Sequence, residues 1–414
     1  MIGFLPKLLS QMPQLSLFQI FCIFLKLGCT SFGGPIAHLG FFREEFVQKR
    51  RWLDDQAYAE LVALCQFLPG PASSQLGMAL GFIQYRVAGA IAAWLGFTLP
   101  SALLLVLLAY AVGEGLLISP WMAGLKIVAV AVVTQALWGM AQSLVHRWSQ
   151  FMLLTVAAIL SISINHLLLQ IAIIAGAAVV GYWSPYAPTT KIGGAKMMGS
   201  APPEMIDASR SFGFLATRSM GFGIAFVLLL VTLPLLADQS ALWLLVDSFY
   251  RAGALVFGGG HVVLPLLEAE LVQIGVVNQE EFVAAYGAAQ AVPGPLFTIA
   301  SYLGFAAGGS MPFTSALLAT LAIFLPGFLL LIAFLPWWKH LRQSDTAQRT
   351  LAGVNAAVVG ILLAAWYDPV LTSALVNWQT TLTALFATAF LIYGRQPAWR
   401  LVALMLVISP FLPT

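Results

Sequence analysis

Long uninterrupted apolar runs constrain the fold of this chain more than any other feature. The runs at 87–112 and 221–237 are close to or above the length of about 18–20 apolar residues that crosses a bilayer as a helix. Only 8% of the 414 residues are charged and 60% are hydrophobic, whereas soluble domains carry about 25% charged residues. The runs are continuous rather than alternating, which disfavours a transmembrane β-barrel. We therefore expect an all-α polytopic membrane protein.

An internal repeat divides the chain. Four segments of the first part recur in the second part, in the same order and at nearly constant spacing. The matched pairs are "FLKLGCTSFGG" (24–34) with "FYRAGALVFGG" (249–259), "AYAELVALCQFLPGP" (57–71) with "EFVAAYGAAQAVPGP" (281–295), the segments that align Pro100 with Pro326, and "GLKIVAVAVV" (124–133) with "GVNAAVVGIL" (353–362). The set predicts two homologous halves joined by a linker rich in Pro, Gly and Ser. We expect an N-terminal lead, a first repeat, a cytoplasmic linker, a second repeat and a C-terminal apolar segment at 1–16, 17–184, 185–217, 218–395 and 396–414.

Charged loops predict that the two halves face opposite ways. The loop after the first FGG carries four basic residues between 43 and 51, whereas the matching loop at 260–281 has four glutamates and no Lys or Arg. By the positive-inside rule the first loop is cytoplasmic and the second is not. The linker and segment 339–349 are also basic and are expected on the cytoplasmic side. The charges of all these loops agree with the positive-inside rule only if the FGG and PGP segments are broken, re-entrant hairpins. This is an inverted-topology repeat, a design of secondary transporters with the site between the repeats.

Two cations occupy the same repeat position. Lys26 and Arg251 each stand seven residues before the first glycine of an FGG motif. A cation deep in an apolar segment costs at least about 2.5–3.5 kcal/mol, so it should face a cavity or a partner. Either residue alone could snorkel to the interface or pair with a structural carboxylate. Their equivalence favours an anion site on the pseudo-two-fold axis. Lys126, whose repeat partner is Asn355, is a third candidate for which snorkelling and function stay open.

The FGG and PGP motifs predict helix breaks. Glycine permits backbone conformations and close approaches that other residues forbid, and a helix N-terminus attracts anions. Two prolines flanking a glycine cannot continue a regular helix, and freed backbone groups at membrane depth must line a wet cavity or be buried in protein. Close helix packing through small residues is the alternative for FGG. The motif residues are Phe32, Gly33, Gly34, Phe257, Gly258 and Gly259, with Pro69, Gly70, Pro71, Pro293, Gly294 and Pro295.

Polar and titratable residues near these motifs are candidates for binding and coupling. Hydroxyl and amide side chains could donate hydrogen bonds to an oxyanion, or could join helices together. They are Ser73, Ser74, Gln75, Thr298 and Ser301, with Gln66 and Gln290 aligned three residues before each PGP. The aligned Glu45 and Glu270, with His38 and His261, are the titratable candidates for proton coupling. For both glutamates we expect solvated loops and a main role in topology.

Other function classes find no support in the sequence. Cys22, Cys29 and Cys65 lack CxxC spacing and a histidine cluster, so they are interpreted as small apolar fillers rather than metal ligands. There is no P-loop for ATP and no GxSxG or HExxH motif for catalysis. We expect no enzyme activity, no cofactor and no metal. The expected partners are a small inorganic anion, protons and membrane lipid, with a homodimer left open. No Lys/Arg-rich tail indicates nucleic acid.

The repeated combination of FGG and PGP resembles the chromate ion transporter family, in its long-chain, two-domain form. The resemblance rests on "FLKLGCTSFGGPIAHLGFFREEFV" with "QFLPGP" and on "FGGGHVVLPLLEAELV" with "QAVPGP", and it covers nearly the whole chain. It implies a bacterial inner-membrane carrier that exports chromate, a tetrahedral dianion resembling sulfate, by drawing on the proton-motive force. It also implies that the FGG and PGP residues and Lys26 are functional, with Arg251 as the counterpart of Lys26.

Three readings of this resemblance stay distinct. The leading one is secondary active transport of chromate, in which the two cations neutralise the anion and the halves rock to alternate access. The second keeps the fold but moves sulfate or another oxyanion, in the uptake direction for instance. The third is a passive anion channel, which would conduct down the gradient without coupling.

Overall fold

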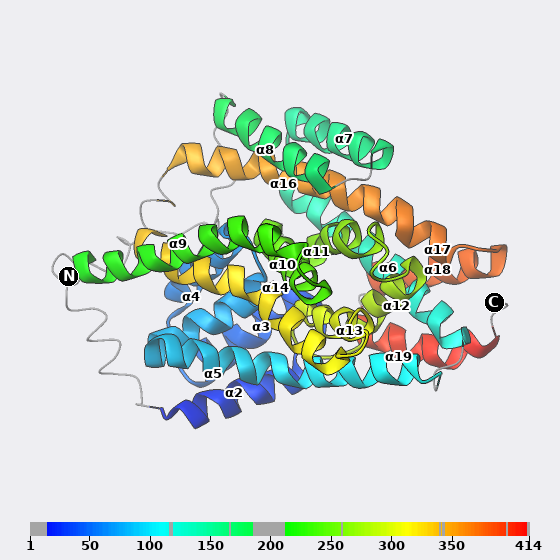
Figure 1. Cartoon of the computed structure of the whole chain (residues 1–414), viewed down its shortest axis with the longest axis horizontal. Coiled ribbons are helices and arrows are strands. Elements are labelled where there is room, and N and C mark those ends of the chain that lie inside the picture. Colours follow the sequence, from blue (N-terminus) through cyan, green and yellow to red (C-terminus); the bar gives the residue numbers. More distant parts are fainter. Residues whose placement is uncertain are drawn as a thin grey trace.

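A computed structural model of the chain describes residues 15–115, 119–164, 167–184, 212–257, 260–338, 341, 344–394 and 396–411. Within these residues every regular element is a helix (Figure 1). In this part of the chain five helices are long and apolar enough to cross a membrane, and six shorter apolar helices accompany them. The prediction of an all-α fold is confirmed for this part of the chain. The lead before Leu15 and most of the linker lie outside the described residues.

The described residues of the first half form seven α-helices and one π-helical segment. Its elements are α2 (Leu17–Thr30), α3 (Gly34–Arg43), the π-helix η1 (Glu44–Lys49), α4 (Asp55–Phe67), α5 (Ala72–Gly113), α6 (Ser119–Leu144), α7 (Trp148–Ser163) and α8 (Leu167–Trp183). Helix α5 is bent at Tyr85 and Arg86, whose backbone angles are not helical. It therefore consists of two consecutive helices.

The second half opens with an additional helix, α9 (Phe212–Ala237), before the repeated elements begin. They are α10 (Ala241–Leu255), η2 (Gly260–Val262), α11 (Val263–Leu267), the π-helix η3 (Glu268–Val272), α12 (Gln279–Ala289), η4 (Leu296–Thr298), α13 (Ile299–Ala306), α14 (Pro312–Phe334), η5 (Leu335–Trp337), α16 (Asp345–Ala365), the π-helical η6 (Trp366–Leu371), α17 (Thr372–Ala374), α18 (Trp378–Ile392), α19 (Ala398–Ile408) and η7 (Ser409–Phe411).

The two halves repeat the same order of elements. Helix α2 corresponds to α10, α3 to α11, η1 to η3 and α4 to α12, and the two parts of α5 correspond to α13 and α14. The helix caps follow the repeat as well, because the side chains of Asp54 and Asn278 accept hydrogen bonds at the starts of α4 and α12. The prediction of two homologous halves is confirmed by this correspondence.

The C-terminal helix pairs are exchanged between the halves. Helices α7 and α8 pack along α16 of the other half (Figure 1), while α18 and α19 pack along α6 of the first half. Glycines allow the close approach: a Cβ on Gly353 would lie 2.3 Å from the Ala177 carbonyl oxygen, and one on Gly124 would lie 2.8 Å from Ser409. Each half is therefore completed by helices of the other.

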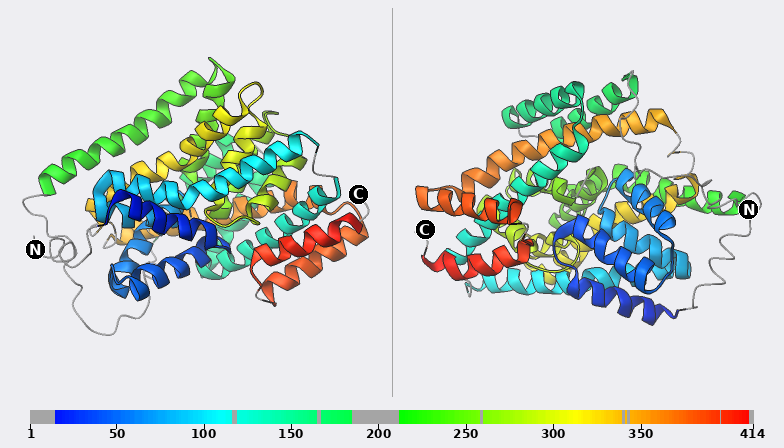
Figure 2. Two further views of the ribbon diagram at one scale, coloured as in Figure 1. Left: turned by 90° about the horizontal axis from the view of Figure 1, so that it is seen from below. Right: turned by 180° about the vertical axis from the view of Figure 1, so that it is seen from behind.

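Helix α9 lies along the edge of the molecule, packed against α10 and α14 (Figure 2, left). Its apolar side chains are largely exposed, with Leu228 at 58% and Leu235 at 73%. Contiguous exposed apolar surface of this kind suits contact with lipid. This helix has no counterpart before α2 among the described residues of the first half.

Candidate functional site at the interface of the two halves

The first FGG motif stands at a helix break. Helix α2 ends at Thr30 and α3 begins at Gly34. Gly33 and Gly34 have φ values of +102° and +75°, a left-handed region that side chains rarely adopt. In the second half α10 ends at Leu255, and Gly258 and Gly259 lie outside the described residues. The first break therefore presents the N-terminus of α3 next to a segment that needs glycine.

Both PGP motifs also lie between helices. Helix α4 ends at Phe67 and α5 begins at Ala72, while α12 ends at Ala289 and η4 begins at Leu296. The central glycines, Gly70 and Gly294, have φ values of +120° and +105°. All four prolines of the two motifs are thus placed where a helix has already stopped.

Two equivalent hydrogen bonds tie the PGP motif of each half to the FGG break of the other. Gly70 N–H donates to the Val256 carbonyl oxygen at 2.8 Å, and Gly294 N–H donates to the Ser31 carbonyl oxygen at 3.0 Å. Ser31 and Val256 immediately precede Phe32 and Phe257, so the two bonds are related by the repeat. The four broken segments therefore meet at one interface, where the motif glycines satisfy buried backbone groups.

The same interface includes the residues that follow the aligned prolines within α5 and α14. A Cβ on Gly70 would lie 3.0 Å from the Gly327 Cα, and a Cβ on Gly294 would lie 2.7 Å from the Ser101 hydroxyl. Side chains reinforce the contact, since Gln75 Nε2 donates to the Gly327 carbonyl oxygen at 3.2 Å. Because Ser101 and Gly327 occupy equivalent repeat positions, the two contacts between the halves, Gly70 with Gly327 and Gly294 with Ser101, are built alike.

Most of the predicted polar residues at this interface are buried. The Thr298 and Ser301 hydroxyls donate to the carbonyls of Pro295 and Thr298, and the Ser301 hydroxyl also lies 3.1 Å from the Ala102 carbonyl oxygen. Ser73 and Ser74 are 3% and 1% exposed. The Ser301–Ala102 contact joins α13 to α5, while a binding role for the serines and for Thr298 stays a prediction.

The two equivalent cations lie in different surroundings. Lys26 is exposed on α2, and no carboxylate of the described residues lies within ion-pair distance of it. Arg251 on α10 is largely buried, and its Nη2 contacts Asp247 Oδ2 at 2.7 Å and Glu270 Oε2 at 2.9 Å. Asp247 was missed from the sequence, although its i, i+4 spacing from Arg251 was a usable signal. A joint role of Lys26 and Arg251 in one anion site stays a prediction.

The expectation that Glu45 and Glu270 lie in solvated loops is wrong. Their residues are 7% and 3% exposed, and both belong to π-helical segments, η1 and η3. Each pairs with an arginine, because Glu45 Oε1 lies 2.7 Å from Arg50 Nε and Glu270 contacts Arg251. Single π-helical turns occur frequently at functional sites. The helices α3 and α11 continue into these turns, which carries the carboxylates inward rather than into solvent.

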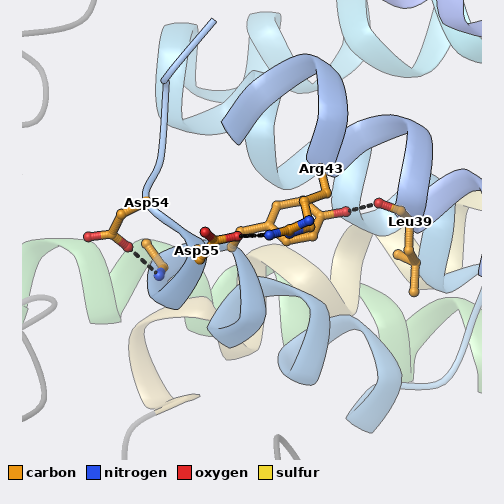
Figure 3. Close-up of polar contacts among 6 residues, drawn as sticks. Leu39, Arg43, Asp54 and Asp55 are labelled. Atoms are coloured by element: carbon orange, nitrogen blue, oxygen red, sulfur yellow. Dashed lines mark hydrogen bonds and ion pairs between the residues drawn. The ribbon is translucent and has the colours of Figure 1, made fainter. Parts of the chain in front are cut away.

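Polar contacts join the C-terminal part of α3 to the start of α4 (Figure 3). Arg43 Nη2 lies 2.7 Å from Asp55 Oδ1, and Asp54 accepts from the Ala57 N–H. The Tyr58 hydroxyl donates to the Leu39 carbonyl oxygen, which joins α4 to α3. Nearby, a hydrogen bond from Lys49 lowers the pKa of Glu44. These contacts order the basic loop on the face of the first half.

Both histidines near the breaks are enclosed. His38 is fully buried, and its Nε2 lies 3.2 Å from the Ser31 carbonyl oxygen. His261 Nδ1 lies within hydrogen-bond distance of the Tyr286 hydroxyl on α12. His38 therefore shares the carbonyl that also accepts from Gly294, whereas His261 faces the hairpin of its own half. A coupling role for His261 stays a prediction.

The remaining predicted residues show that the two hairpins pack differently. Lys126 on α6 pairs with Glu280 at the start of α12, with Nζ 3.2 Å from Oε2. Its repeat partner Asn355 has a buried Oδ1 without a hydrogen-bond partner among the described residues. Gln290 is 8% exposed, whereas its counterpart Gln66 is exposed. The second-half hairpin is thus closed onto α6, and the first-half hairpin leaves its glutamine open.

Comparisons with known proteins match both halves. The family model "Chromate transporter" matches residues 18–182 and 243–409. The chain is 28% identical to the "Probable chromate transport protein" of Synechococcus elongatus over 87% of this chain and 86% of the relative. It is 28% identical to the "Chromate transport protein" of Cupriavidus metallidurans over 92% of this chain and 89% of the relative. No solved structure matches the chain.

A shorter relative matches only part of the chain. It is an uncharacterized transporter of Bacillus subtilis, 29% identical over 173 residues, which are 40% of this chain and 96% of the relative. A relative of about half the length fits a chain that is built from two homologous halves.

Proposed function

This chain belongs to the chromate transporter family, and we propose that it carries chromate across the membrane as a secondary active transporter. The observation that carries the proposal is the match of the family model to both halves of a multi-pass helical protein. Relatives named for chromate transport cover nearly the whole chain and support the same conclusion. The proposed location is the bacterial inner membrane, and the proposed direction is export.

The proposed anion site combines charge with backbone donors at the interface of the halves. Arg251 supplies a positive charge beside the break after α10, and Lys26 supplies one at the equivalent place beside the break after α2. The N-terminus of α3, opened by Gly33 and Gly34, offers N–H groups that attract an anion. A tetrahedral dianion needs both features, because its charge and its four oxygens must be satisfied away from water.

The proposed coupling uses the buried carboxylates around Arg251. Asp247 and Glu270 both contact its guanidinium, so the cluster carries one more acidic than basic group. A buried excess charge is costly, which favours a proton shared within the cluster. Glu270 and the anion would compete for Arg251, and this competition would link anion release to proton movement. Inward proton flow would then drive chromate out.

The proposed transport cycle alternates the packing of the two hairpins. In the structure α12 is closed onto α6 through the Lys126–Glu280 pair, while Gln66 of the first-half hairpin is exposed. Unequal packing of equivalent elements supports alternating access, in which the halves exchange their arrangements. By the charge of the loops, the open hairpin faces the cytoplasm.

Uptake of labelled chromate into everted membrane vesicles tests this function. Everted vesicles turn export into uptake, so a transporter should accumulate chromate saturably when the vesicle lumen is acidified. Sulfate in excess, as a competing tetrahedral dianion, measures how strictly the site selects chromate. Absence of chromate accumulation under any imposed gradient would contradict the proposal. Gradient-independent, non-saturating flux would instead identify a passive channel.

A further inference from the structure

A small polar cavity lies between the exchanged helices of the first half and the π-helical turn of the second. Its volume is about 30 Å³, which is room for about two water molecules. The α7–α8 pair, η3, α16 and η6 all contribute to its wall. The polar lining residues are Ser161, Gln170, Glu268 and Asp368. A cavity lined in this way is built to hold water or an ion rather than an apolar group.

Two buried oxygens of the lining residues have no partner. Ser161 and Gln170 are 5% and 2% exposed. The Ser161 Oγ and the Gln170 Oε1 are both buried without a hydrogen-bond partner among the described residues. An unsatisfied buried polar atom costs about 1–3 kcal/mol. These oxygens therefore call for a ligand that donates hydrogen bonds or accepts lone pairs.

The chemistry of the lining points to a small hard cation. The cavity adds the carboxylates of Glu268 and Asp368 to the amide and hydroxyl oxygens, and no Lys, Arg or His is among its described lining residues. Oxygen ligands with negative charge select hard cations. Asp368 is exposed and Glu268 is 6% exposed. The acidic residues thus lead from the surface inward.

The inner end of this cavity adjoins the Arg251 cluster. Glu268 and Glu270 are two residues apart on the same π-helical turn, so they point to roughly opposite sides of it. Glu268 lines the cavity, whereas Glu270 contacts Arg251. A charge change at Glu268 would therefore be felt by the carboxylate that competes with the anion for Arg251.

The place of the cavity in the fold matches the proposed sidedness. Ser161 and Gln170 flank the turn between α7 and α8, and Asp368 follows the end of α16. Helix α8 ends before the basic linker, and α16 begins at Asp345, within the basic segment 339–349. These helices therefore reach the cavity at the face opposite the cytoplasmic loops.

We propose that this cavity takes up the coupling proton from the outer face and delivers it to Glu268. The inference rests on the proposed function of proton-coupled export. A proton arriving as hydronium would be held by the Gln170 and Ser161 oxygens, and its transfer would convert the Glu268 carboxylate to the acid and leave water. The first half has no such acid, because the residue aligned with Glu268 is Arg43, which pairs with Asp55.

Other titratable groups lie on η3, on the elements packed against it or in the lining of the cavity, and a change of pH would affect each of them. They are Asp247 and Arg251 on α10, Asp368 on η6, Glu270 on η3 itself, and Glu280, Glu281 and Tyr286 on α12.

Transport by the purified full-length protein in vesicles tests the proposal. The two variants are Glu268→Gln and, at the mouth, Asp368→Asn, with Glu114→Gln as the control because Glu114 is an exposed carboxylate outside the cavity. One assay measures chromate accumulation driven by an acidic lumen with the membrane potential clamped. The other measures exchange of labelled for unlabelled chromate without a gradient, which needs no net proton transfer. A third arm replaces the pH gradient by a sodium gradient.

The expected result is that Glu268→Gln loses the pH-driven accumulation while chromate exchange persists. Asp368→Asn should reduce the pH-driven accumulation less than Glu268→Gln does, because Asp368 lies at the exposed mouth of the cavity. Full pH-driven accumulation by both variants would overturn the proposal while leaving the proposed function in place. Drive by sodium in the wild type would overturn the proton as the cation. Absence of any pH drive in the wild type would instead refute the coupling assumed in the proposed function.

Discussion

The two halves share one frame but differ in charge. Equivalent hydrogen bonds, from Gly70 to Val256 and from Gly294 to Ser31, lock the broken segments together on both sides. The charged groups do not follow this symmetry: Arg251 sits in a buried cluster of carboxylates, whereas Lys26 is exposed. Likewise Glu268 lines a cavity where the first half has Arg43 in an exposed ion pair. The comparison indicates that the repeat builds the scaffold, and we propose that the departures from it carry the coupling.

The largest expected effect on stability comes from removing Arg251. Arg251→Gln leaves Asp247 and Glu270 buried without their cation, and breaking a buried pair in this way costs about 3–5 kcal/mol. Lys26→Gln removes an exposed charge and should leave the melting temperature in detergent nearly unchanged. Thermal unfolding of both purified variants measures the difference. Equal melting temperatures would show that the buried cluster does not stabilise the second half.

Substitution of the central glycine of either PGP motif should lower the melting temperature in both halves. Gly70→Ala and Gly294→Ala each force a side chain into a left-handed conformation, at about 1–2 kcal/mol, and bring Cβ to within 3.0 Å and 2.7 Å of the opposite half. Gly115→Ala is the matched control, because Gly115 also has positive φ, at +69°, but has nothing within 4 Å of its Cβ. We expect Gly70→Ala and Gly294→Ala both to melt at a lower temperature than Gly115→Ala. A lower melting temperature for only one of the two variants would contradict the equivalence of the two contacts.

The smallest expected effect on stability is at the pair that closes the second-half hairpin. Lys126 Nζ lies 3.2 Å from Glu280 Oε2, and Glu280 is 79% exposed. The Lys126 side chain is 12% exposed, but its partner carboxylate is solvated, so we expect the pair to contribute about 0–1 kcal/mol. Lys126→Gln should therefore barely change the melting temperature but should alter the transport rate, because it loosens α12 from α6. An unchanged chromate uptake rate would remove this pair from the proposed cycle.

The sequence predicts the scaffold better than the charged sites. Duplicated motifs reveal the repeat. The glycines and prolines of the motifs around Gly33 and Gly70 mark the helix breaks, because these residues alter the backbone at their own positions. The burial of Glu45 and Glu270 was missed, since the positive-inside rule concerns the side of the membrane and not the depth of a side chain. The exchange of α7 and α8 with α18 and α19 was missed too. Uniformly apolar helices carry no pattern that selects one neighbour over another.

Initial rates of chromate uptake by Lys26→Gln and Arg251→Gln, compared with the wild type, test the central claim most directly. The claim is that equivalent cations of the two halves serve one anion, although their surroundings differ. Protein amount in the membrane is measured alongside, so that folding losses are separated from transport losses. We predict that both variants lose saturable uptake while each still inserts. Near-normal uptake by both variants would contradict the account and would leave the two cations with structural roles alone.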